Sequence, residues 1–579
     1  MSRGQSLDEA IDHWLARDPD PAMRAEIQAI RAAENTSELE ARFTARLAFG
    51  TAGLRGVVGA GPGRMNRLVI RETSAGLAQY LLKAVDGAAN RGIVVGYDAR
   101  PDSRQFAEDA VCVFAAFGFR VFLTATEQPT PVGAFAVTEL NAAAGIVVTA
   151  SHNPPEYNGY KVYWENGAQI IPPHDRAIAD HIDAAAMADL PWKDFDAVAN
   201  SEQLALLDDQ FVAKYSARVV EAIAQWHTAP QNGISVAYTA LHGVGAKLAT
   251  ALSAQCGIQD FWSVPSQHEP DGQFPTVDFP NPEEDGAMDA VIALAAEHQA
   301  TLACANDPDA DRLAVAARDT DGNYVMLSGD QIGILLGDYC LRQQDGETQI
   351  LAASLVSSRM LGRIAESANA TYLETLTGFK WLSNMALAEQ TPRKRFVFAY
   401  EEALGYAMGQ IVRDKDGLSA LMLFCQLTAT LADQGKTVFD RLEELYVTHG
   451  LFLTHQQSIR TTPGQASITD QIRRNSPDTI GGIAVTSTKD LQTLTHRFAD
   501  GREVALDNHP NDVVIFYLED DSRIIVRPSG TEPKTKCYYE VKGDIQNPAD
   551  YVDARRRTRQ RLDQLIDRHQ SAVQQLMAG

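Results

Sequence analysis

A chain of 579 residues is longer than one ordinary domain, and a formal net charge of −24 argues against a general binder of nucleic acids or membrane surfaces. The content of 45% hydrophobic and 22% charged residues is typical of globular proteins with large cores and argues against disorder. We therefore expect no nucleic-acid partner and no membrane partner, and any site for a small anion must be a local cluster of basic side chains.

The cysteines and the N-terminal segment bear on the compartment. The six cysteines are far apart and form no C-x-x-C pair, so neither a zinc site nor a redox motif is indicated. The first twenty residues lack the basic-then-apolar order of a signal peptide, and no apolar run reaches the roughly 18–20 residues of a membrane span. We expect a cytoplasmic protein with reduced thiols, either a monomer or a homodimer.

Strand–helix–strand patterns follow a helical N-terminal segment. Apolar residues at helical spacing predict helices within the first 48 residues. Segments 92–124, 233–265 and 348–378 each predict an apolar strand, a polar loop, a helix and a second strand. Their strand-to-strand distance of about 22–28 residues is that of a βαβ unit. The strands are continuously apolar, which is expected where helices cover both faces of a sheet.

The chain after about residue 455 has a different pattern. It predicts a small sheet, with strands in GGIAVTSTKD, DVVIFYLED, SRIIVRPSG and TKCYYEVKG, and a C-terminal helix at about 548–577. We therefore expect an α/β fold with three topologically related α/β domains and a small C-terminal α+β domain. Ligands of α/β domains collect at the loops that follow the carboxyl ends of strands, so the domains could share one cleft.

Three carboxylates, Asp307, Asp309 and Asp311, alternate in one loop between two apolar strands. Their mutual repulsion falls when a hard cation binds, and Mg²⁺ prefers such oxygen ligands. An EF-hand loop also begins with alternating carboxylates, but it needs glycine at its sixth position and glutamate at its twelfth, where this chain has Arg312 and Arg318. The loop predicts a magnesium site, with a solvated acidic turn as the alternative.

A single serine, Ser151, ends the buried-looking strand of AGIVVTASHNPPEYNGYK at 144–161. A serine hydroxyl is a poor nucleophile at neutral pH and needs a base or a metal. No G-x-S-x-G elbow is present, which argues against an α/β-hydrolase, and phosphoryl transfer assisted by a metal fits better. The alternative is a serine that only caps a helix or stabilises a turn.

Further loops offer donors for a sugar phosphate. SRIIVRPSGTEPK (522–534) combines Arg527 with two hydroxyls and free backbone N–H groups, a set that suits a phosphate, although an ordinary turn with surface cations is the alternative. The glutamates of VFAYEEALGY (397–406) could accept hydrogen bonds from sugar hydroxyls, or could begin a solvated helix. Lys415 of IVRDKDG could meet a phosphate, and TLTGFKW (375–381) places Lys380 at a strand-end turn.

Together these motifs resemble the α-D-phosphohexomutase family. The similarity spans about residues 40–545 and is closest to the phosphoglucomutase branch that includes phosphopentomutase-like enzymes. The motifs that carry it are G-T-A-G-L-R-G at 50–56, T-A-S-H-N-P at 149–154, D-P-D-A-D-R at 307–312, T-G-F-K-W at 377–381, E-E-A-L-G at 401–405 and R-P-S-G-T-E-P at 527–533.

The resemblance implies four domains around a central cleft and a role for each. Domain I (1–205) would carry a phosphoserine loop, domain II (206–318) a metal loop, domain III (319–455) a sugar-binding loop and domain IV (456–579) a phosphate-binding loop. Mg²⁺ would be held by Asp307, Asp309, Asp311 and an oxygen on Ser151. The implied catalytic residues are Ser151, His152, Lys161 and Arg55. The implied substrate-binding residues are Arg312, Thr377, Gly378, Lys380, Glu401, Lys415, Arg527, Ser529, Gly530 and Thr531.

The implied reaction interconverts glucose 1-phosphate and glucose 6-phosphate, with glucose 1,6-bisphosphate as intermediate and activator. The general base stays open between His152, which titrates near neutrality, and Lys161, if a nearby cation lowers its pKa. Ala403 stands where many hexomutases have serine, which keeps a phosphomannomutase or a phosphopentomutase open. The alternatives from other classes are a non-catalytic sugar-phosphate binder and a serine phosphatase-like hydrolase.

Overall fold

The structure is a computed structural model that describes residues 6–50, 53–226, 233–341, 348–409, 411–460, 467–528 and 534–578. These residues pack into two compact units. The first comprises the described residues within Met1–Ser354 and Ala370–Thr437, and the second those within Leu355–Asn369 and Val438–Gly579. Within the described residues, no helix combines the length and the apolar character needed to cross a bilayer.

The first unit begins with three helices, which confirms the helical N-terminal segment. They are α1 (Leu7–Arg17), α2 (Pro21–Ala32) and α3 (Thr36–Phe43). Ser6 and Glu9 form a capping box at the start of α1, so two of the N–H groups that a helix start leaves unpaired are satisfied. The apolar side chains of the three helices share one small core that includes Ile11, Trp14 and Phe43.

A six-stranded sheet follows, in the order β1-β5-β4-β2-β3-β6. Its strands are β1 (Gly53–Val57), β2 (Ile93–Tyr97), β3 (Val121–Thr124), β4 (Ala144–Val148), β5 (Tyr157–Trp164) and β6 (Leu204–Leu207). β2, β3 and β4 run parallel, and every residue of these strands is buried, as expected for strands covered on both faces. The helices of this segment are α4 (Arg67–Ala84), α5 (Ala88–Arg91), α6 (Ser103–Ala116), α7 (Thr130–Glu139), α8 (His174–Ala186), α9 (Phe195–Ala199) and α10 (Asp209–Trp226).

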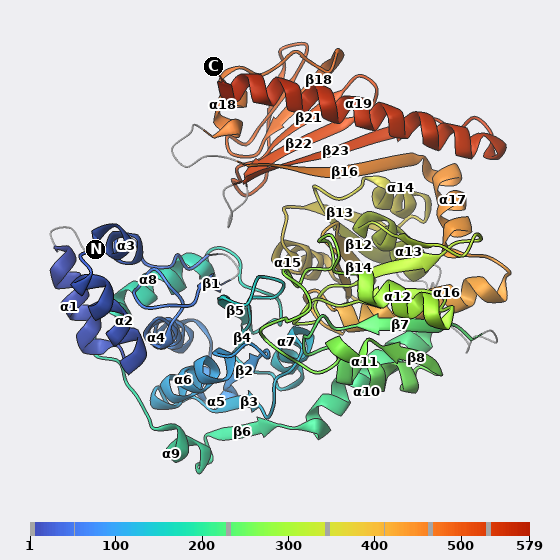
Figure 1. Cartoon of the computed structure of the whole chain (residues 1–579). Helices are drawn as coiled ribbons and strands as arrows, with labels where there is room; N and C mark the ends of the chain where they lie inside the picture. The colour runs from blue at the N-terminus through green and yellow to red at the C-terminus, as the bar shows by residue number, and fades with distance from the viewer. Residues whose placement is uncertain are drawn as a thin grey trace. The chain divides into compact units, whose positions relative to one another are not determined.

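Two smaller sheets complete the first unit (Figure 1). The order β11-β10-β9-β7-β8 joins β7 (Ser235–Thr239), β8 (Asp260–Ser263), β9 (Leu302–Ala305), β10 (Ala314–Arg318) and β11 (Tyr324–Met326). The order β13-β12-β14-β15 joins β12 (Thr348–Ser354), β13 (Thr371–Thr375), β14 (Lys394–Glu401) and β15 (Gly405–Met408). The helices are α11 (Ala246–Gln255), α12 (Asp289–His298), α13 (Gly329–Leu341), α15 (Phe379–Glu389) and α16 (Gly417–Asp433).

The three predicted βαβ units are confirmed. β2–α6–β3, β7–α11–β8 and β12–α14–β13 each end in a parallel pair of strands, with α14 at Met360–Ser367. The loops at the carboxyl ends of β2, β4 and β9 carry Asp98, Ser151 and Asp307. The topology therefore places the polar loops where α/β domains bind ligands.

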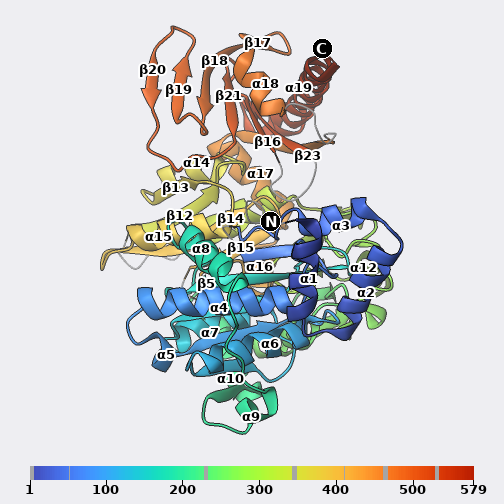
Figure 2. The same ribbon diagram turned by 90° about the vertical axis from the view of Figure 1, so that its left-hand side faces the viewer.

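The second unit contains an antiparallel sheet in the order β16-β23-β22-β21-β18-β19-β20. Helix α19 lies along its strands (Figure 1), and β20 is one of the two edge strands (Figure 2). The predicted strands and the C-terminal helix are confirmed. The elements are α17 (Val438–His449), β16 (Leu451–Arg460), α18 (Ile468–Arg474), β17 (Thr479–Ile480), β18 (Ile483–Asp490), β19 (Thr495–Phe498), β20 (Glu503–Ala505), β21 (Val514–Leu518), β22 (Arg523–Pro528), β23 (Lys534–Gly543) and α19 (Tyr551–Ala578).

Candidate active site

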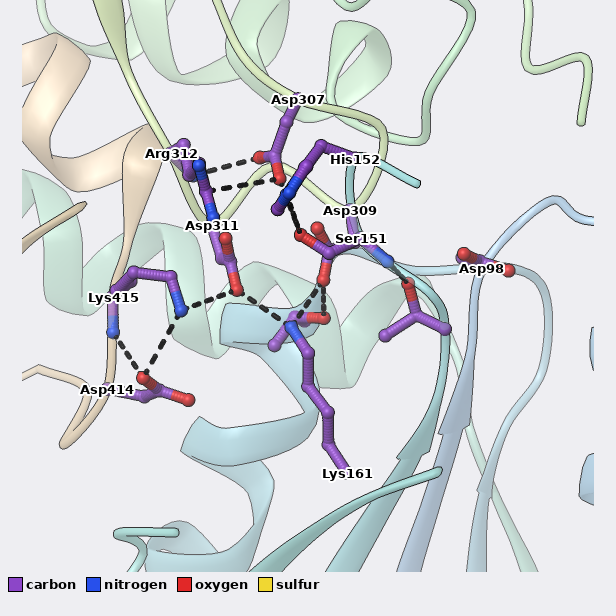
Figure 3. A network of polar contacts seen from close by, with 12 residues as sticks. Asp98, Ser151, His152, Lys161, Asp307, Asp309, Asp311, Arg312, Asp414 and Lys415 are labelled. Carbon is purple, nitrogen blue, oxygen red and sulfur yellow. Dashed lines mark hydrogen bonds and ion pairs between the residues drawn. The ribbon is translucent and has the colours of Figure 1, made fainter. Parts of the chain in front are cut away.

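Ser151 lies in the turn after β4 and is 3% exposed. Its backbone is left-handed, with φ of 55°, and its N–H donates to Thr149 Oγ1 at 2.8 Å. The hydroxyl donates to Asp307 Oδ2, also at 2.8 Å, across 156 positions of sequence (Figure 3). The hydroxyl of Ser151 thus donates its hydrogen bond to the carboxylate loop and does not cap a helix.

The three carboxylates converge in the loop between β9 and β10. Asp307, Asp309 and Asp311 are each 0% exposed, and each offers an oxygen atom within 4.8 Å of the others. Thr130, at the start of α7, donates its hydroxyl to Asp309 Oδ2 at 2.6 Å and its N–H to the Asp309 carbonyl at 2.9 Å. The loop is a buried constellation and not a solvated acidic turn.

Cationic side chains surround this triad (Figure 3). Lys161 Nζ, on β5, lies 2.6 Å from Asp309 Oδ2 and 2.7 Å from Asp311 Oδ2. Lys415 Nζ lies 3.1 Å from the same oxygen of Asp311. Arg312 donates its backbone N–H to Asp307 Oδ1 at 2.9 Å, and its guanidinium lies 3.3 Å from Glu283 and 4.0 Å from Asp307. Three cations therefore offset three buried carboxylates.

The surroundings shift the pKa values of these groups. Burial, together with the charges of Asp309 and Asp311, raises the pKa of Asp307 well above its ordinary value. Burial opposes the charge of Lys161, but the two carboxylates that it contacts outweigh burial and raise its pKa. Desolvation and the charges of Arg312 and Arg55 lower the pKa of His152 well below its ordinary value. The surroundings thus lower the pKa of His152 below the range expected from its residue type, and they raise the pKa of Lys161 rather than lower it.

The triad has the character of a metal site. Asp309 Oδ1 and Asp311 Oδ1 are buried and accept no hydrogen bond from the residues that the structure describes, which is costly for carboxylate oxygens unless a cation is close. Asp307 Oδ2 and Ser151 Oγ lie beside them. The candidate metal ligands are therefore all hard oxygen atoms, a set that suits a divalent cation. Among the residues that the structure describes, this is the group of carboxylates that could hold a metal ion.

The glutamate loop is a hairpin turn and not the start of a helix. Glu401 ends β14, and Gly405 opposite it begins β15. The carboxylate of Glu401 accepts the N–H of Gly378 at 2.6 Å, and Gly378, with φ of 111°, precedes α15. This contact brings the 377–380 turn to Glu401, with Thr377 half-buried and Lys380 buried in the first turn of α15. A bridge between Arg312 and Gly405 joins the hairpin to the metal loop.

Arg55 and Arg527 lie on strands of different sheets. Arg55, on β1, is paired opposite Gly159 of β5, and its guanidinium donates to Asn153 Oδ1 at 3.1 Å, next to the serine loop. Arg527 lies half-buried in β22 of the second unit, paired opposite Lys536 of β23. The remaining predicted phosphate-loop residues, Ser529, Gly530 and Thr531, lie outside the described residues.

Several polar residues of the site were not singled out from the sequence. Arg100 contacts the serine loop, and Glu283 contacts Arg312. Asp414, fully buried, accepts from Tyr163 at 2.8 Å and from Gln169 at 2.7 Å, and lies 3.8 Å from Lys415 Nζ. Arg100 lies in the loop after β2, so the rule that ligands collect at strand ends could have found it. Arg312 is 29 positions from Glu283, and Tyr163 and Gln169 are 251 and 245 positions from Asp414, so the sequence does not indicate these contacts.

Comparison with known proteins defines the class of this molecule. Models of the phosphoglucomutase/phosphomannomutase family match along the chain: α/β/α domain I at residues 46–189, domain II at 213–322, domain III at 328–449 and the C-terminal domain at 485–557. The chain therefore belongs to this family, the α-D-phosphohexomutases, and is a mutase of the isomerase class.

Individual relatives are named as mutases of different sugar phosphates. A probable phosphomannomutase of Haemophilus influenzae is 40% identical over 84% of this chain and 95% of its own. A probable phosphoribomutase of Schizosaccharomyces pombe is 37% identical over 93% of this chain and 94% of its own. The crystal structure of the phosphoglucomutase pp63/parafusin from Paramecium, in an open form, shares the fold with a TM-score of 0.68 at 17% identity, over 92% of this chain and 96% of that one. The sugar is not resolved by these relatives.

Proposed function

We propose that the protein is a phosphoglucomutase that interconverts glucose 1-phosphate and glucose 6-phosphate, with Ser151 as the carrier of the phosphoryl group. The observation that carries this proposal is the contact between Ser151 Oγ and Asp307 Oδ2 inside a buried carboxylate triad. A serine held against three carboxylates and three cations suits phosphoryl transfer, in which catalysis consists mainly of positioning and charge stabilisation.

The reaction has two transfers that balance. In the first, the bond between phosphorus and Ser151 Oγ breaks and Oγ takes up a proton, while a bond from phosphorus to a free sugar hydroxyl oxygen forms and the hydroxyl proton moves to a base. The product is glucose 1,6-bisphosphate, which turns over in the site. In the second, Ser151 Oγ gives up its proton to a base as its bond to the other phosphoryl group forms, and the sugar oxygen whose bond to phosphorus breaks takes up a proton.

We propose Mg²⁺ as the metal, held by Asp307, Asp309, Asp311 and a phosphoserine oxygen on Ser151; when bound, it would offset negative charge on the transferring phosphoryl group. The chain's own cations, Lys161, Lys415 and Arg312, keep the triad in place around the serine. For a proton moved at Ser151 Oγ, geometry favours His152, whose Nδ1 lies 3.3 Å away, over Lys161, whose ammonium is bound by two carboxylates.

We assign substrate binding to two groups of residues. Glu401, with Thr377, Gly378 and Lys380 beside it, would contact sugar hydroxyls, and Arg55 and Lys415 would meet a phosphate. Arg527, Ser529, Gly530 and Thr531 would hold the phosphate that is not reacting. We propose the domain ranges 1–205, 206–318, 319–455 and 456–579 for the serine, metal, sugar and phosphate loops. The separate sheets of β1–β6, β7–β11 and β12–β15 support three α/β domains, although β6 crosses the boundary at 205 and β11 lies beyond the boundary at 318.

The second candidate is a phosphopentomutase. Ala403, in the turn between β14 and β15, offers no hydroxyl to a sugar where many hexomutases have serine. Relatives named phosphoribomutase and phosphopentomutase are 37% and 35% identical to this chain, against 34% for one named phosphoglucomutase. A phosphomannomutase is the third candidate, supported by the Haemophilus influenzae relative.

A coupled assay with glucose, mannose and ribose 1-phosphates, each with catalytic bisphosphate, tests the proposal. We expect the highest kcat/KM for glucose 1-phosphate, and a higher value for ribose 1-phosphate would establish the second candidate. Intact mass should show a phosphate adduct that Ser151→Ala abolishes together with turnover, whereas the exposed Ser37→Ala should retain both. Full activity of Ser151→Ala would refute the serine carrier, and release of inorganic phosphate at the mutase rate would indicate a hydrolase instead.

A further inference from the structure

Arg100 binds the serine loop through its backbone. The guanidinium donates to four carbonyl oxygens: those of Ser151 at 2.8 Å, Asn153 at 2.5 Å, Pro154 at 2.7 Å and Tyr157 at 3.0 Å. Arg100 is 3% exposed, so these contacts are made away from water. It follows β2, whereas the carbonyls belong to the loop between β4 and β5.

The guanidinium is itself held on two sides. Its Nε lies 3.3 Å from Asp98 Oδ2, and Asp98 Oδ1 accepts the backbone N–H of Arg100 at 3.1 Å. Asp98 lies beside the serine loop in Figure 3. On the other side, the ring of Phe274 lies 5.1 Å from the guanidinium carbon, within the range of a cation–π contact. Arg100 therefore connects the first sheet, the serine loop and the 271–276 loop.

The serine loop needs this support because of its backbone. Ser151 is left-handed, with φ of 55°, a conformation that is unfavourable for a non-glycine residue and persists where the surroundings enforce it. The carbonyls of Ser151, Asn153, Pro154 and Tyr157 all accept from one side chain, and the planar guanidinium with its fork of donors fits that arrangement. The ammonium of a lysine has only three donors and cannot reproduce it.

We infer that Arg100 is a positioning residue for phosphoryl transfer, and that it holds the serine loop so that Ser151 Oγ faces Asp307. Its two terminal nitrogen atoms both donate to backbone carbonyls, so it acts on the reaction through the loop rather than as a ligand of the phosphate. This inference rests on the proposed role of Ser151 as the phosphoryl carrier.

The test compares Arg100→Lys with Asp98→Asn and with the control Arg104→Lys, whose exposed side chain pairs with Glu108 on α6. Displacing a reacting group by about 1 Å costs on the order of 100-fold in rate. We therefore expect Arg100→Lys to lower kcat about 100-fold with KM changed by less than about threefold, because the loop and not the sugar site is disturbed. The single-turnover transfer from preformed phosphoserine to glucose 1-phosphate should slow by the same factor, and Arg104→Lys should match the wild type.

Asp98→Asn keeps the size of the side chain and removes its charge. We expect it to lower kcat about tenfold with KM unchanged, since the guanidinium keeps its carbonyl partners but loses its anchor. If Arg100→Lys does not fold, this variant decides the question, and an unchanged kcat in Asp98→Asn overturns the inference. A folded Arg100→Lys with wild-type kcat, or with a loss only in KM, also overturns it. A wild-type enzyme without phosphoserine and without mutase activity would refute the proposed function instead.

Discussion

The ammonium nitrogen of Lys161 lies 2.6 Å from Asp309 Oδ2, although 148 positions separate the two residues in sequence. Lys161 also contacts Asp311 Oδ2, so one cation is shared by two carboxylates of the metal loop. Within the described part of the chain, the second oxygen of each of these two carboxylates, Oδ1, accepts no hydrogen bond. Lys161 thus holds the triad from one side and leaves its free oxygen atoms for a cation on the other.

Replacing Lys161 by glutamine should separate the stability of the triad from its affinity for metal. Removing one partner of a buried ion pair costs about 3–5 kcal/mol, because the remaining carboxylates lose their compensating charge. In EDTA we expect a lower Tm than in the wild type. Since Mg²⁺ would then meet a more negative site, it should bind more tightly to the variant than to the wild type, while kcat falls.

Calorimetric titration of Mg²⁺, together with Tm values with and without Mg²⁺, measures both effects. Lys214→Gln is the matched control, because this lysine is 58% exposed at its side chain and its nearest carboxylate, Glu139, is 3.9 Å away. Weaker Mg²⁺ binding by Lys161→Gln would show that the lysine arranges the triad rather than competing with the metal.

Asp309→Asn should weaken metal binding without a large change in side-chain volume. The amide supplies less charge, and its NH₂ group would compete for space beside Lys161 and Thr130. We expect the Mg²⁺ concentration that gives half-maximal turnover to rise at least about tenfold. Asp285→Asn, at an exposed position, is the control. An Asp309→Asn enzyme with the wild-type Mg²⁺ dependence would argue against the triad as the metal site.

Gly243→Ala should displace the 307–311 loop, because Gly243 packs against the backbone of Pro308. A Cβ atom at this position would lie 2.3 Å from both the Cα and the carbonyl oxygen of Pro308, a distance that backbone atoms cannot tolerate, so the loop must move. We expect a loss of stability of about 1–3 kcal/mol, as for other overpacked sites, and a reduced kcat. Urea unfolding and steady-state kinetics check this, with Gly233→Ala as the control because nothing lies within 4 Å of its added Cβ. Equal kcat values for the two variants would contradict the expectation.

The second unit should lose stability in acid because of His569 on α19. Burial lowers the pKa of this side chain from 6.5 to about 4, and its Nδ1 lies 2.9 Å from the hydroxyl of Tyr539. Between these two pH values the unfolded chain binds a proton that the folded chain does not, so stability falls as the pH decreases from 6.5 to about 4. The full loss amounts to about 3 kcal/mol.

Hydrogen exchange of peptides from α19 and β23, measured between pH 7 and pH 4 and corrected for intrinsic rates, reports this loss. His569→Gln should flatten the dependence on pH, whereas the exposed His13→Gln should leave it unchanged. The same slope in His569→Gln as in the wild type would assign the acid sensitivity to other groups.

Periodicity predicted much of the fold because each βαβ unit is local. The pair β2 and β3 is joined by α6 within 92–124, and the continuous apolar runs of β2 and β4 correspond to strands with every residue buried. The Ser151 and Asp307 loops were recognised for a similar reason, since each stands at the end of an apolar strand. The hairpin that carries Glu401 could equally have begun a helix, because the residues after β14 have no pattern that separates the two.

The amino-acid order was sufficient for much of the secondary structure, for the residue types of the site and for the family, because these depend on neighbours in sequence and on short motifs. The electrostatic state of the site depends on groups that only folding brings together. His152 and Lys161 were both candidates for the base by residue type, but the pKa of one is lowered by desolvation and by Arg312, and that of the other is raised by Asp309 and Asp311. Arg100 reaches Ser151 from another strand in the same way. Burial and Coulomb energy depend on distances in space. The sequence does not specify such distances for pairs as far apart as Lys161 and Asp309, 148 positions, or Ser151 and Asp307, 156 positions.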